Sequence, residues 1–330
     1  MSSPYSSVVL DERPAFLNFS PDGRSLLVST YQLDDHSQGD VSSCRIGSLR
    51  VFPTSSLDSI SSSPNASKIT TSGGIFRFVD QDDDHVLAAL TTGSLASINW
   101  RTGNVTEVQV AKDSMLLDCA IRPSSSFAAS STNRGELVVT DLGTGEEVTR
   151  FAGHHLPWTS APAEVWTCDW AERELLCSGG EDAMVKLWDT RAVAGERPSS
   201  TIKGFDAGVT FVSCVPDGNS LLTGSYDEHI RLFDLRASKQ PLLAVKTCGG
   251  VWNVVGAEGG WLAACMYGGW MLVNGDLHPL AMDEGAGASL LYGAALSPNS
   301  STLAVCTFND STLSVVSFTE AESITQYFAA

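Results

Sequence analysis

Hydrophobic residues along the chain fall into short runs, and residues that favour turns separate one run from the next. The apolar run at 26–30 follows the turn 20–23 (Ser-Pro-Asp-Gly), and the same order of turn and run recurs at 215–223 and 296–306. Short runs bounded by Pro, Gly, Asn and Asp predict β-strands joined by tight turns. Helical patterns are scarce and short. The pattern therefore predicts an all-β protein.

One strand–turn–strand pattern occurs twice in closely similar form, at 175–191 and 221–236. Each copy ends in an aromatic residue followed by Asp, and the aromatic residues are Trp188 and Phe233. These two positions are 45 residues apart, a period typical of the four-stranded blades of a β-propeller. The pattern resembles that of the WD-repeat family.

In that family a Gly-His pair, a strand Ser, a turn Asp and the Trp of one unit form a chain of hydrogen bonds. The resemblance implies this structural role for four residues of one unit: His154, Ser178, Asp182 and Trp188. The next unit keeps the turn residue, Asp227, but has Phe233 in place of Trp and no Gly-His pair. We expect the network of that unit to be incomplete.

Weaker copies of the pattern fill the rest of the chain and predict one domain over residues 1–330, a seven-bladed WD-repeat β-propeller. The predicted units are 14–52, 68–101, 104–143, 146–190, 200–236, 240–275 and 277–318. The segment 5–12 belongs to no unit. We expect it to be the outer strand of the last blade, because this pairing closes the ring and removes two free sheet edges. The Ser-rich stretch 54–68 predicts a flexible loop.

Charge and composition narrow the classes of partner. Twenty Lys and Arg against 38 Asp and Glu give a formal net charge of −18, which disfavours nucleic acids and anionic membranes and favours a basic protein. No apolar run approaches the roughly 20 residues of a membrane-spanning helix. The eight cysteines form no C-x-x-C pair and predict small core residues in a reducing compartment. We expect a soluble, cytoplasmic monomer.

No common catalytic motif, glycine-rich nucleotide-binding motif or zinc pattern is present, so we expect neither a cofactor nor a metal. The acidic stretch 80–85 lacks the Gly and distal Glu of a calcium loop and predicts a solvated turn. Any hydrolase site would combine residues from several blades. Glu228 and His229 are candidate catalytic residues, because they lie in a turn expected at the mouth of the central channel. The alternative is that His229 is simply exposed to water.

Aromatic and polar residues are expected around the same mouth, at the starts of the first strands and in the turns of each unit. The candidates for substrate binding are Tyr31, Gln32, Glu164, Trp166, Tyr226, Gly250, Trp252 and Tyr292. The aromatic members are suited to holding a peptide or a modified, cationic side chain by stacking and cation–π contacts. Ordinary packing between blades is the alternative interpretation.

Several strings resemble the WD-repeat diphthine methylesterase family of the diphthamide pathway, and they are spread over five of the seven units. The strings are 29–33 (STYQL), 178–182 (SGGED), 223–230 (TGSYDEHI), 239–241 (KQP), 249–252 (GGVW) and 291–294 (LYGA). The resemblance implies a carboxylic ester hydrolase. Its reaction would be hydrolysis of the methyl ester of methylated diphthine on translation elongation factor 2, giving diphthine and methanol.

The roles that this reaction would need can be assigned to the residues above. His229 would act as general base, oriented by Glu228 or Asp227, and backbone N–H groups near Gly250 would stabilise the oxyanion. The aromatic residues would hold the trimethylammonium group. A second interpretation from a different class is a non-catalytic adaptor that docks a peptide or protein on the channel mouth. Release of methanol would distinguish the two.

Overall fold

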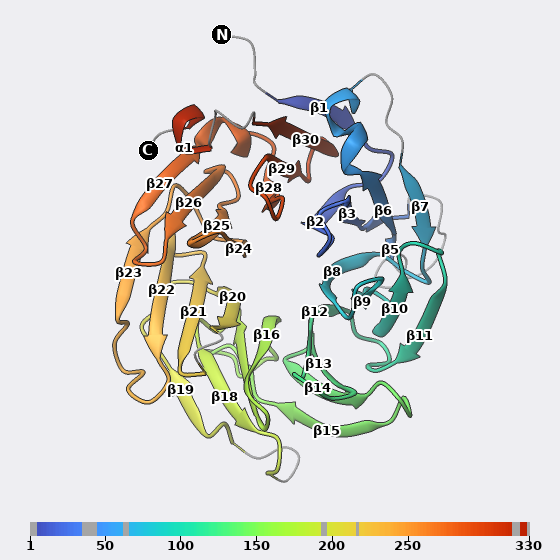
Figure 1. Ribbon diagram of the computed structural model, residues 1–330. Helices are drawn as coiled ribbons and strands as arrows, with labels where there is room; N and C mark the ends of the chain where they lie inside the picture. Colours follow the sequence, from blue (N-terminus) through green and yellow to red (C-terminus); the bar gives the residue numbers. More distant parts are fainter. Residues whose placement is uncertain are drawn as a thin grey trace.

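Seven four-stranded antiparallel sheets are arranged around a central channel in the computed structural model (Figure 1). The structure describes residues 5–34, 45–61, 66–192, 197–215, 218–318 and 324–328. Each sheet is one blade of a β-propeller, and its first strand along the chain lies nearest the channel in blades 1 to 6. The prediction of an all-β, seven-bladed propeller is confirmed.

The first four blades follow one another along the chain and have these bounds. Blade 1 consists of β2 (Pro14–Phe19), β3 (Ser25–Thr30), β6 (Ser48–Pro53) and β7 (Ser67–Thr70). Blade 2 consists of β8 (Ile75–Asp80), β9 (His85–Leu90), β10 (Ser94–Asn99) and β11 (Val105–Gln109). Blade 3 consists of β12 (Leu116–Ile121), β13 (Phe127–Thr132), β14 (Glu136–Asp141) and β15 (Glu147–Ala152). Blade 4 consists of β16 (Val165–Glu172), β17 (Leu175–Gly180), β18 (Val185–Asp189) and β19 (Ser200–Ile202).

The remaining three blades complete the ring. Blade 5 consists of β20 (Val209–Cys214), β21 (Ser220–Ser225), β22 (His229–Asp234) and β23 (Leu243–Lys246). Blade 6 consists of β24 (Asn253–Ala257), β25 (Gly260–Ala264), β26 (Trp270–Asn274) and β27 (Pro279–Asp283). Blade 7 consists of β28 (Leu291–Leu296), β29 (Thr302–Thr307), β30 (Thr312–Ser317) and, from the other end of the chain, β1 (Ser6–Val9). The predicted units are offset from these blades, because most of them begin with the outer strand of the preceding blade.

Strand β1 closes the ring by pairing antiparallel with β30, with Ser6 opposite Val315 and Val9 opposite Thr312. The residue before β1 adds a link to blade 6, since the Tyr5 hydroxyl accepts a hydrogen bond from Trp270 Nε1 (2.9 Å) and donates one to Asp283 (2.8 Å). The predicted closure by an N-terminal strand is confirmed.

The Ser-rich stretch 54–68 differs from the predicted flexible loop. Its first part forms the 3-10 helix η1 (Thr54–Ser59), and its last part begins β7. Leu57 and Ile60 are each 1% exposed and pack against the core between blades 1 and 7. These two apolar side chains, three positions apart, anchor a segment whose composition alone suggests a loop. Residues 62–65 of the stretch lie outside the described residues.

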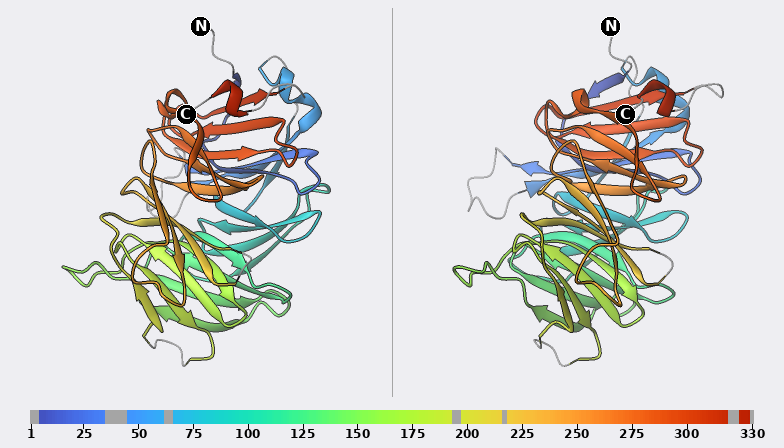
Figure 2. Two further views of the ribbon diagram at one scale, coloured as in Figure 1. Left: turned by 60° about the vertical axis from the view of Figure 1, so that its left-hand side comes forward. Right: turned by 90° about the vertical axis from the view of Figure 1, so that its left-hand side faces the viewer.

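Two segments project from one face of the ring (Figure 2). One is the small hairpin of β4 (Gln32–Leu33) and β5 (Arg45–Ile46), which is inserted between β3 and β6 of blade 1. The other follows the Gly-His pair of blade 4 and is narrowed by a β-bridge between His155 and Pro162. Tyr31 directly precedes the first segment, Glu164 follows the second, and these two residues lie at the channel mouth. Both segments therefore flank that mouth.

Blade 4 contains a buried chain of four hydrogen-bonded side chains. Trp188 Nε1 donates to Ser178 Oγ (2.8 Å), which is 2.7 Å from His154 Nε2, and His154 Nδ1 is 2.9 Å from Asp182 Oδ1. The neutral imidazole with its proton on Nδ1 satisfies every contact. Burial lowers the pKa of His154 and favours this neutral form, although Asp182 opposes the shift.

The helices of the protein are short. In the described part of the chain they are, besides η1, η2 (Glu284–Gly287) and α1 (Ile324–Tyr327). Within the described parts of the chain, none is long or apolar enough to cross a membrane. Seven cysteines are described and all are free, five of them buried, while Cys44 lies outside the described residues.

Candidate functional site

A β-bulge near the start of the innermost strand directs one residue of most blades toward the channel mouth. The pairing of the innermost strand with its neighbour skips one residue in six blades: Ala15, Phe76, Leu117, Trp166, Thr210 and Tyr292. A bulge leaves its extra residue unpaired and re-aims the side chain. In blade 6, Trp252 takes the corresponding place just before β24.

A cavity of about 430 Å³ lies at this mouth, and every blade contributes to it. It is lined by Tyr31, Arg45, Phe76, Met115, Leu117, Asn133, Glu164, Trp166, Tyr226, Trp252 and Tyr292. Six of these eleven residues are aromatic. The predicted substrate-binding residues Tyr31, Glu164, Trp166, Tyr226, Trp252 and Tyr292 are thus brought together.

The aromatic rings contact one another in a continuous series around the cavity. Trp166 meets Tyr226 edge to face with ring centroids 4.9 Å apart, Tyr226 stacks on Trp252 at 5.9 Å, and Trp252 stacks on Tyr292 at 4.7 Å. Tyr31 continues the series through Phe76, with centroids 5.2 Å apart. Rings held by neighbours on both sides lose little freedom on binding, so the wall is preorganised.

The polar groups of the cavity are few and fixed. Trp166 Nε1 donates to Glu164 Oε2 (2.8 Å), which holds the carboxylate against the aromatic wall. Burial raises the pKa of Tyr31, Tyr226 and Tyr292, so their phenols stay protonated well above neutral pH. The cavity therefore combines apolar faces with the Glu164 carboxylate, the Arg45 guanidinium, the Asn133 amide and three phenols.

Arg77 lies beneath the aromatic wall and spans the channel from blade 2. Its Nη2 donates to the carbonyl oxygens of Trp252 (2.9 Å) and Thr210 (3.1 Å), and its Nη1 is 3.4 Å from Asp118 Oδ2. The guanidinium carbon is 5.6 Å from the centroid of the Trp252 ring. Arg77 also lines another cavity, of about 330 Å³, together with Asp80, Asp118 and Asp169. It thus separates an aromatic chamber from an acidic one.

The predicted catalytic pair does not belong to the aromatic cavity, because neither Glu228 nor His229 is among its eleven lining residues. Glu228 has a φ of 63° in the turn before β22, and its carboxylate is 3.3 Å from Lys246 of the outer strand. His229 Nδ1 donates to the carbonyl oxygen of Asp227 (2.7 Å). The structure thus places both side chains outside the lining of this cavity, and their assignment to catalysis stays a prediction.

Three further predicted residues have other places. The Asp227 carboxylate pairs with Arg231 through both oxygens (2.9 Å each) and supports the turn of blade 5. Gln32 lines a neighbouring cavity and accepts a hydrogen bond from the Arg13 backbone N–H (3.3 Å). Gly250 lies behind Tyr226, where an added Cβ would be 3.3 Å from the ring. Gly250 therefore supports the position of an aromatic wall residue instead of lining the cavity.

Five lining residues were not predicted: Arg45, Phe76, Met115, Leu117 and Asn133. Phe76 and Leu117 occupy the same bulge position as Trp166 and Tyr292, so applying the strand-start rule to blades 2 and 3 would have found them. Arg45 lies in β5, inside the hairpin that is inserted in blade 1. The repeat pattern carries no signal for it.

The fold and this site define the class of the protein, a WD-repeat β-propeller with an aromatic cavity at one mouth of its channel. Two stretches of the chain, 145–189 and 196–234, match the family described as WD domain, G-beta repeat. A chain in the crystal structure of the mitotic checkpoint complex superimposes with a TM-score of 0.73 over 97% of this chain and 96% of that chain. At 14% identity, this similarity concerns the fold alone.

Sequence similarity identifies the chain as a homologue of proteins named diphthine methyltransferase. The relative from Mus musculus is 31% identical over 217 residues, which are 60% of this chain and 40% of the relative. The relative from Homo sapiens is 30% identical over 239 residues, 67% of this chain and 47% of the relative. A homolog from Dictyostelium discoideum is 28% identical over 188 residues, 48% and 51% of the two chains. The matched region thus spans about half the length of these relatives.

Proposed function

We propose that this protein hydrolyses the methyl ester of methylated diphthine on translation elongation factor 2, giving diphthine and methanol. Support comes from the homologues named for diphthine and from the chemistry of the mouth cavity. The observation that carries the proposal is the series of aromatic rings beside the Glu164 carboxylate. A trimethylammonium group donates no hydrogen bond, and aromatic faces with a nearby negative charge are the usual means of binding it.

Glu164 is the best-placed general base in the cavity. Its Oε2 is held by Trp166 Nε1, and within the described residues Oε1 accepts no hydrogen bond. Oε1 can accept a proton from a water molecule as the water oxygen bonds to the ester carbonyl carbon. The bond from that carbon to the methoxy oxygen then breaks, and methanol leaves with the proton returned by Glu164. The phenols of the wall supply hydrogen-bond donors to the carbonyl oxygen.

The reaction is tested by measuring methanol released from elongation factor 2 that carries methylated diphthine. Glu164→Gln keeps the size of the side chain and removes its basicity, so kcat should fall about 10²-fold or more with a smaller change in KM. His229→Ala is the matched control and should keep wild-type kcat, because His229 lies outside the cavity.

Three results would contradict this assignment. Absence of methanol with the wild-type protein would exclude hydrolysis. Unchanged kcat in Glu164→Gln would exclude Glu164 as the base. Recovery of an isotopically labelled ester methyl group on an acceptor molecule, and not in methanol, would indicate a methyltransferase in place of a hydrolase.

A second function, a non-catalytic adaptor, is favoured by exposed aromatic residues near the mouth. Trp158 is 85% exposed in the segment between the two residues of the His155–Pro162 bridge. Tyr267 is 64% exposed in the turn between β25 and β26, next to Met266, which packs against the aromatic wall. If the protein is an adaptor, the wild type should bind the modified elongation factor and release no methanol.

A further inference from the structure

The cavity of about 330 Å³ beneath Arg77, here called the acidic chamber, occupies the other half of the channel. The innermost strands begin at the aromatic mouth and run away from it. In β8, Phe76 lines the aromatic cavity and Asp80, four residues further on, lines the acidic chamber. In β16 the same holds for Trp166 and Asp169. The acidic chamber therefore lies toward the opposite end of the channel from the aromatic cavity.

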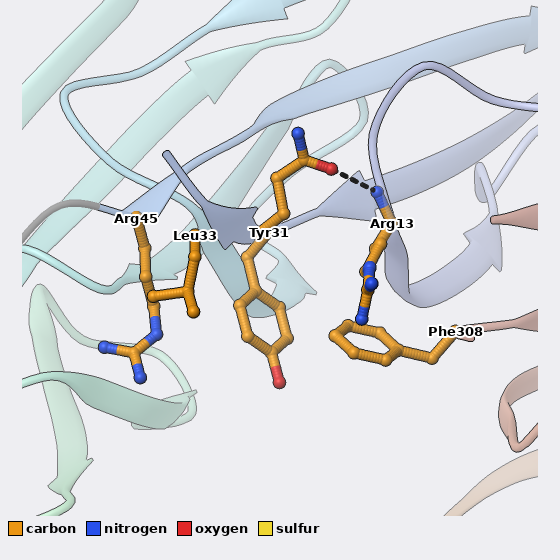
Figure 3. A pocket seen from close by; sticks show the side chains of 6 residues that line it. Arg13, Tyr31, Leu33, Arg45 and Phe308 are labelled. Atoms are coloured by element: carbon orange, nitrogen blue, oxygen red, sulfur yellow. Dashed lines mark hydrogen bonds between the residues drawn. The ribbon is translucent and has the colours of Figure 1, made fainter. Parts of the chain in front are cut away.

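The two ends of the channel carry opposite charge. Beside the aromatic mouth, Arg13 and Arg45 lie on opposite sides of the Tyr31 ring in a cavity of about 380 Å³ (Figure 3). Neither arginine forms an ion pair with a carboxylate of the described residues. Three aspartates line the acidic chamber instead: Asp80, Asp118 and Asp169. A cation is therefore repelled at the aromatic mouth and attracted to the chamber at the other end.

The aspartates of the acidic chamber differ in their partners. Asp118 has a cation beside it, since Arg77 Nη1 is 3.4 Å from its Oδ2. Asp169 accepts a hydrogen bond from Cys214 N (2.7 Å) but has no cationic partner among the described residues, and burial raises its pKa to about 6. The exposed Asp80 carboxylate forms no hydrogen bond or ion pair with any described residue. Two carboxylates of the chamber are thus uncompensated, and a cation between them would favour their charged forms.

A buried amide also faces the chamber without a partner. Asn253 lines the chamber from blade 6 and is only 4% exposed. Its backbone pairs with Ala264, but its side-chain amide forms no hydrogen bond with a described residue. Leaving a buried amide unpaired costs roughly 1–3 kcal/mol, so native proteins complete such groups with water or a polar ligand. This amide is a second indication of a ligand, independent of the carboxylates.

Apolar side chains make up much of the remaining wall and narrow the kind of cation. Phe16, Phe78 and Phe211 line the chamber from three blades, and Phe16 meets Phe78 edge to face with ring centroids 4.9 Å apart. Within the described chain, no three His, Cys, Asp or Glu side chains converge as a metal ion requires. A chain of methylene groups ending in a primary ammonium suits the chamber better. Its methylenes pack on the phenylalanines, and its three N–H donors meet carboxylate and amide oxygens.

We propose that the acidic chamber binds a lysine-type alkylammonium group, with its ammonium directed toward Asp80, Asp169 and Asn253 and its methylenes against Phe78 and Phe211. The group is supplied either by a lysine side chain of a partner protein or by a free diamine, which share this chemistry. The inference goes beyond the proposed function. Because the site lies in the half of the channel away from the aromatic cavity, its occupation does not depend on ester hydrolysis.

Calorimetric titration with N-acetyl-lysine methylamide tests the inference, and N-acetyl-norleucine methylamide is the probe that lacks the ammonium. The wild-type protein should bind the lysine probe about tenfold or more tightly than the norleucine probe, a difference of about 1.4 kcal/mol. Asp80→Asn should abolish this preference and keep the wild-type melting temperature, because Asp80 has no partner to lose. Asn253→Leu should weaken the lysine probe alone. A diamine, 1,5-diaminopentane, distinguishes the sources: tighter binding than the lysine probe indicates a free diamine, and weaker binding indicates a protein side chain.

The matched control is Asp83→Asn, which removes the same charge from the exposed turn between β8 and β9, outside the chamber, and should bind every probe like the wild type. Equal weakening in Asp83→Asn and Asp80→Asn would overturn the inference, because net charge alone would then explain the binding. Equal affinity of the wild type for the lysine and norleucine probes would also overturn it. So would binding of Mg²⁺ by the wild type without binding of either ammonium probe.

Discussion

Individual side chains in blade 4 show how a local sequence pattern becomes a buried network. The glycine of the Gly-His pair is required because a Cβ at Gly153 would lie 2.0 Å from Trp188 Cη2. Asp182 accepts from His154 on one oxygen and from Lys186 Nζ (2.6 Å) on the other. Burial alone would raise the pKa of Asp182, but these two partners lower it. The carboxylate therefore stays charged inside the blade.

Removing this carboxylate should destabilise the protein. Asp182→Ala leaves buried His154 Nδ1 without its acceptor and Lys186 Nζ with only the Gly153 carbonyl oxygen, and the expected cost is about 1–3 kcal/mol. Urea unfolding at pH 7 measures it. Asp189→Ala in the same blade is the control, because its partner Arg191 is 72% exposed and surface ion pairs contribute little. Equal stability of Asp182→Ala and the control would show that the network is not stabilising.

The residues of the site were predictable to different degrees at this scale. Tyr226, Asp227, Glu228 and His229 are consecutive in one turn, and the sequence places all four near the mouth. Only Tyr226 lines the aromatic cavity, because the left-handed conformation of Glu228 reverses the chain into β22. Which residue of a tight turn faces a cavity depends on dihedral angles that residue types at this position do not determine.

Secondary-structure elements were predicted best where hydrophobic pattern and turn residues agree. The hydrophobic pattern and the turn residues agree in most blades. The N-terminal segment belonged to no unit and one blade lacked a strand, so the pairing that closes the ring could be predicted. The bulges were not predicted, although they decide which residues reach the channel. Nothing in strand composition distinguishes a bulged residue from its neighbours, so Phe76, which was missed, could have been predicted only by comparison with the equivalent Trp166.

The closing strand gives a test at the scale of elements. Deleting residues 1–9 removes β1 and the Tyr5 links to Trp270 and Asp283 but keeps Glu12, which bonds to Thr30 and Ser48 in blade 1. The exposed edge of β30 should lower the melting temperature by several degrees, measured by calorimetry. Deleting residues 2–4 is the control and should leave it unchanged. An unaltered melting temperature in the longer deletion would contradict the closure.

Across the whole molecule, Arg77 connects blades that are distant along the chain. Its guanidinium reaches Asp118 of blade 3 and the carbonyl oxygens of Trp166, Thr210 and Trp252 in blades 4 to 6. A lone Arg in an apolar strand was visible in the sequence, but its partners, up to 175 positions away, were not. Contacts across a ring depend on closure, which no local pattern encodes.

Removing this cation should cost stability in a pH-dependent way. Burial already raises the pKa of Asp118, and Arg77 opposes the shift. In Arg77→Met the pKa of Asp118 should rise further, so the folded state binds a proton that the unfolded state releases, and stability falls as pH rises. The expected loss is about 3–5 kcal/mol at pH 8 and less at pH 5, measured by urea unfolding.

The double variant Arg77→Met/Asp118→Asn provides the control. It removes the unpaired carboxylate along with the cation, so it should regain much of the lost stability and show little dependence on pH. If Arg77→Met alone loses the same unfolding free energy at pH 5 and at pH 8, the loss of the Arg77–Asp118 ion pair is not the cause of the lower stability.

The pairing of β1 with β30 also has a consequence for biosynthesis. Ser7 and Ser314, whose hydroxyls are 2.8 Å apart in the closed ring, are 307 positions apart along the chain. The earliest strand must therefore stay unpaired while six blades are synthesised, and the ring locks only when the last blade emerges. Such delayed, long-range assembly is slow and exposes sheet edges to aggregation, so the nascent chain should depend on chaperones until β1 pairs with β30.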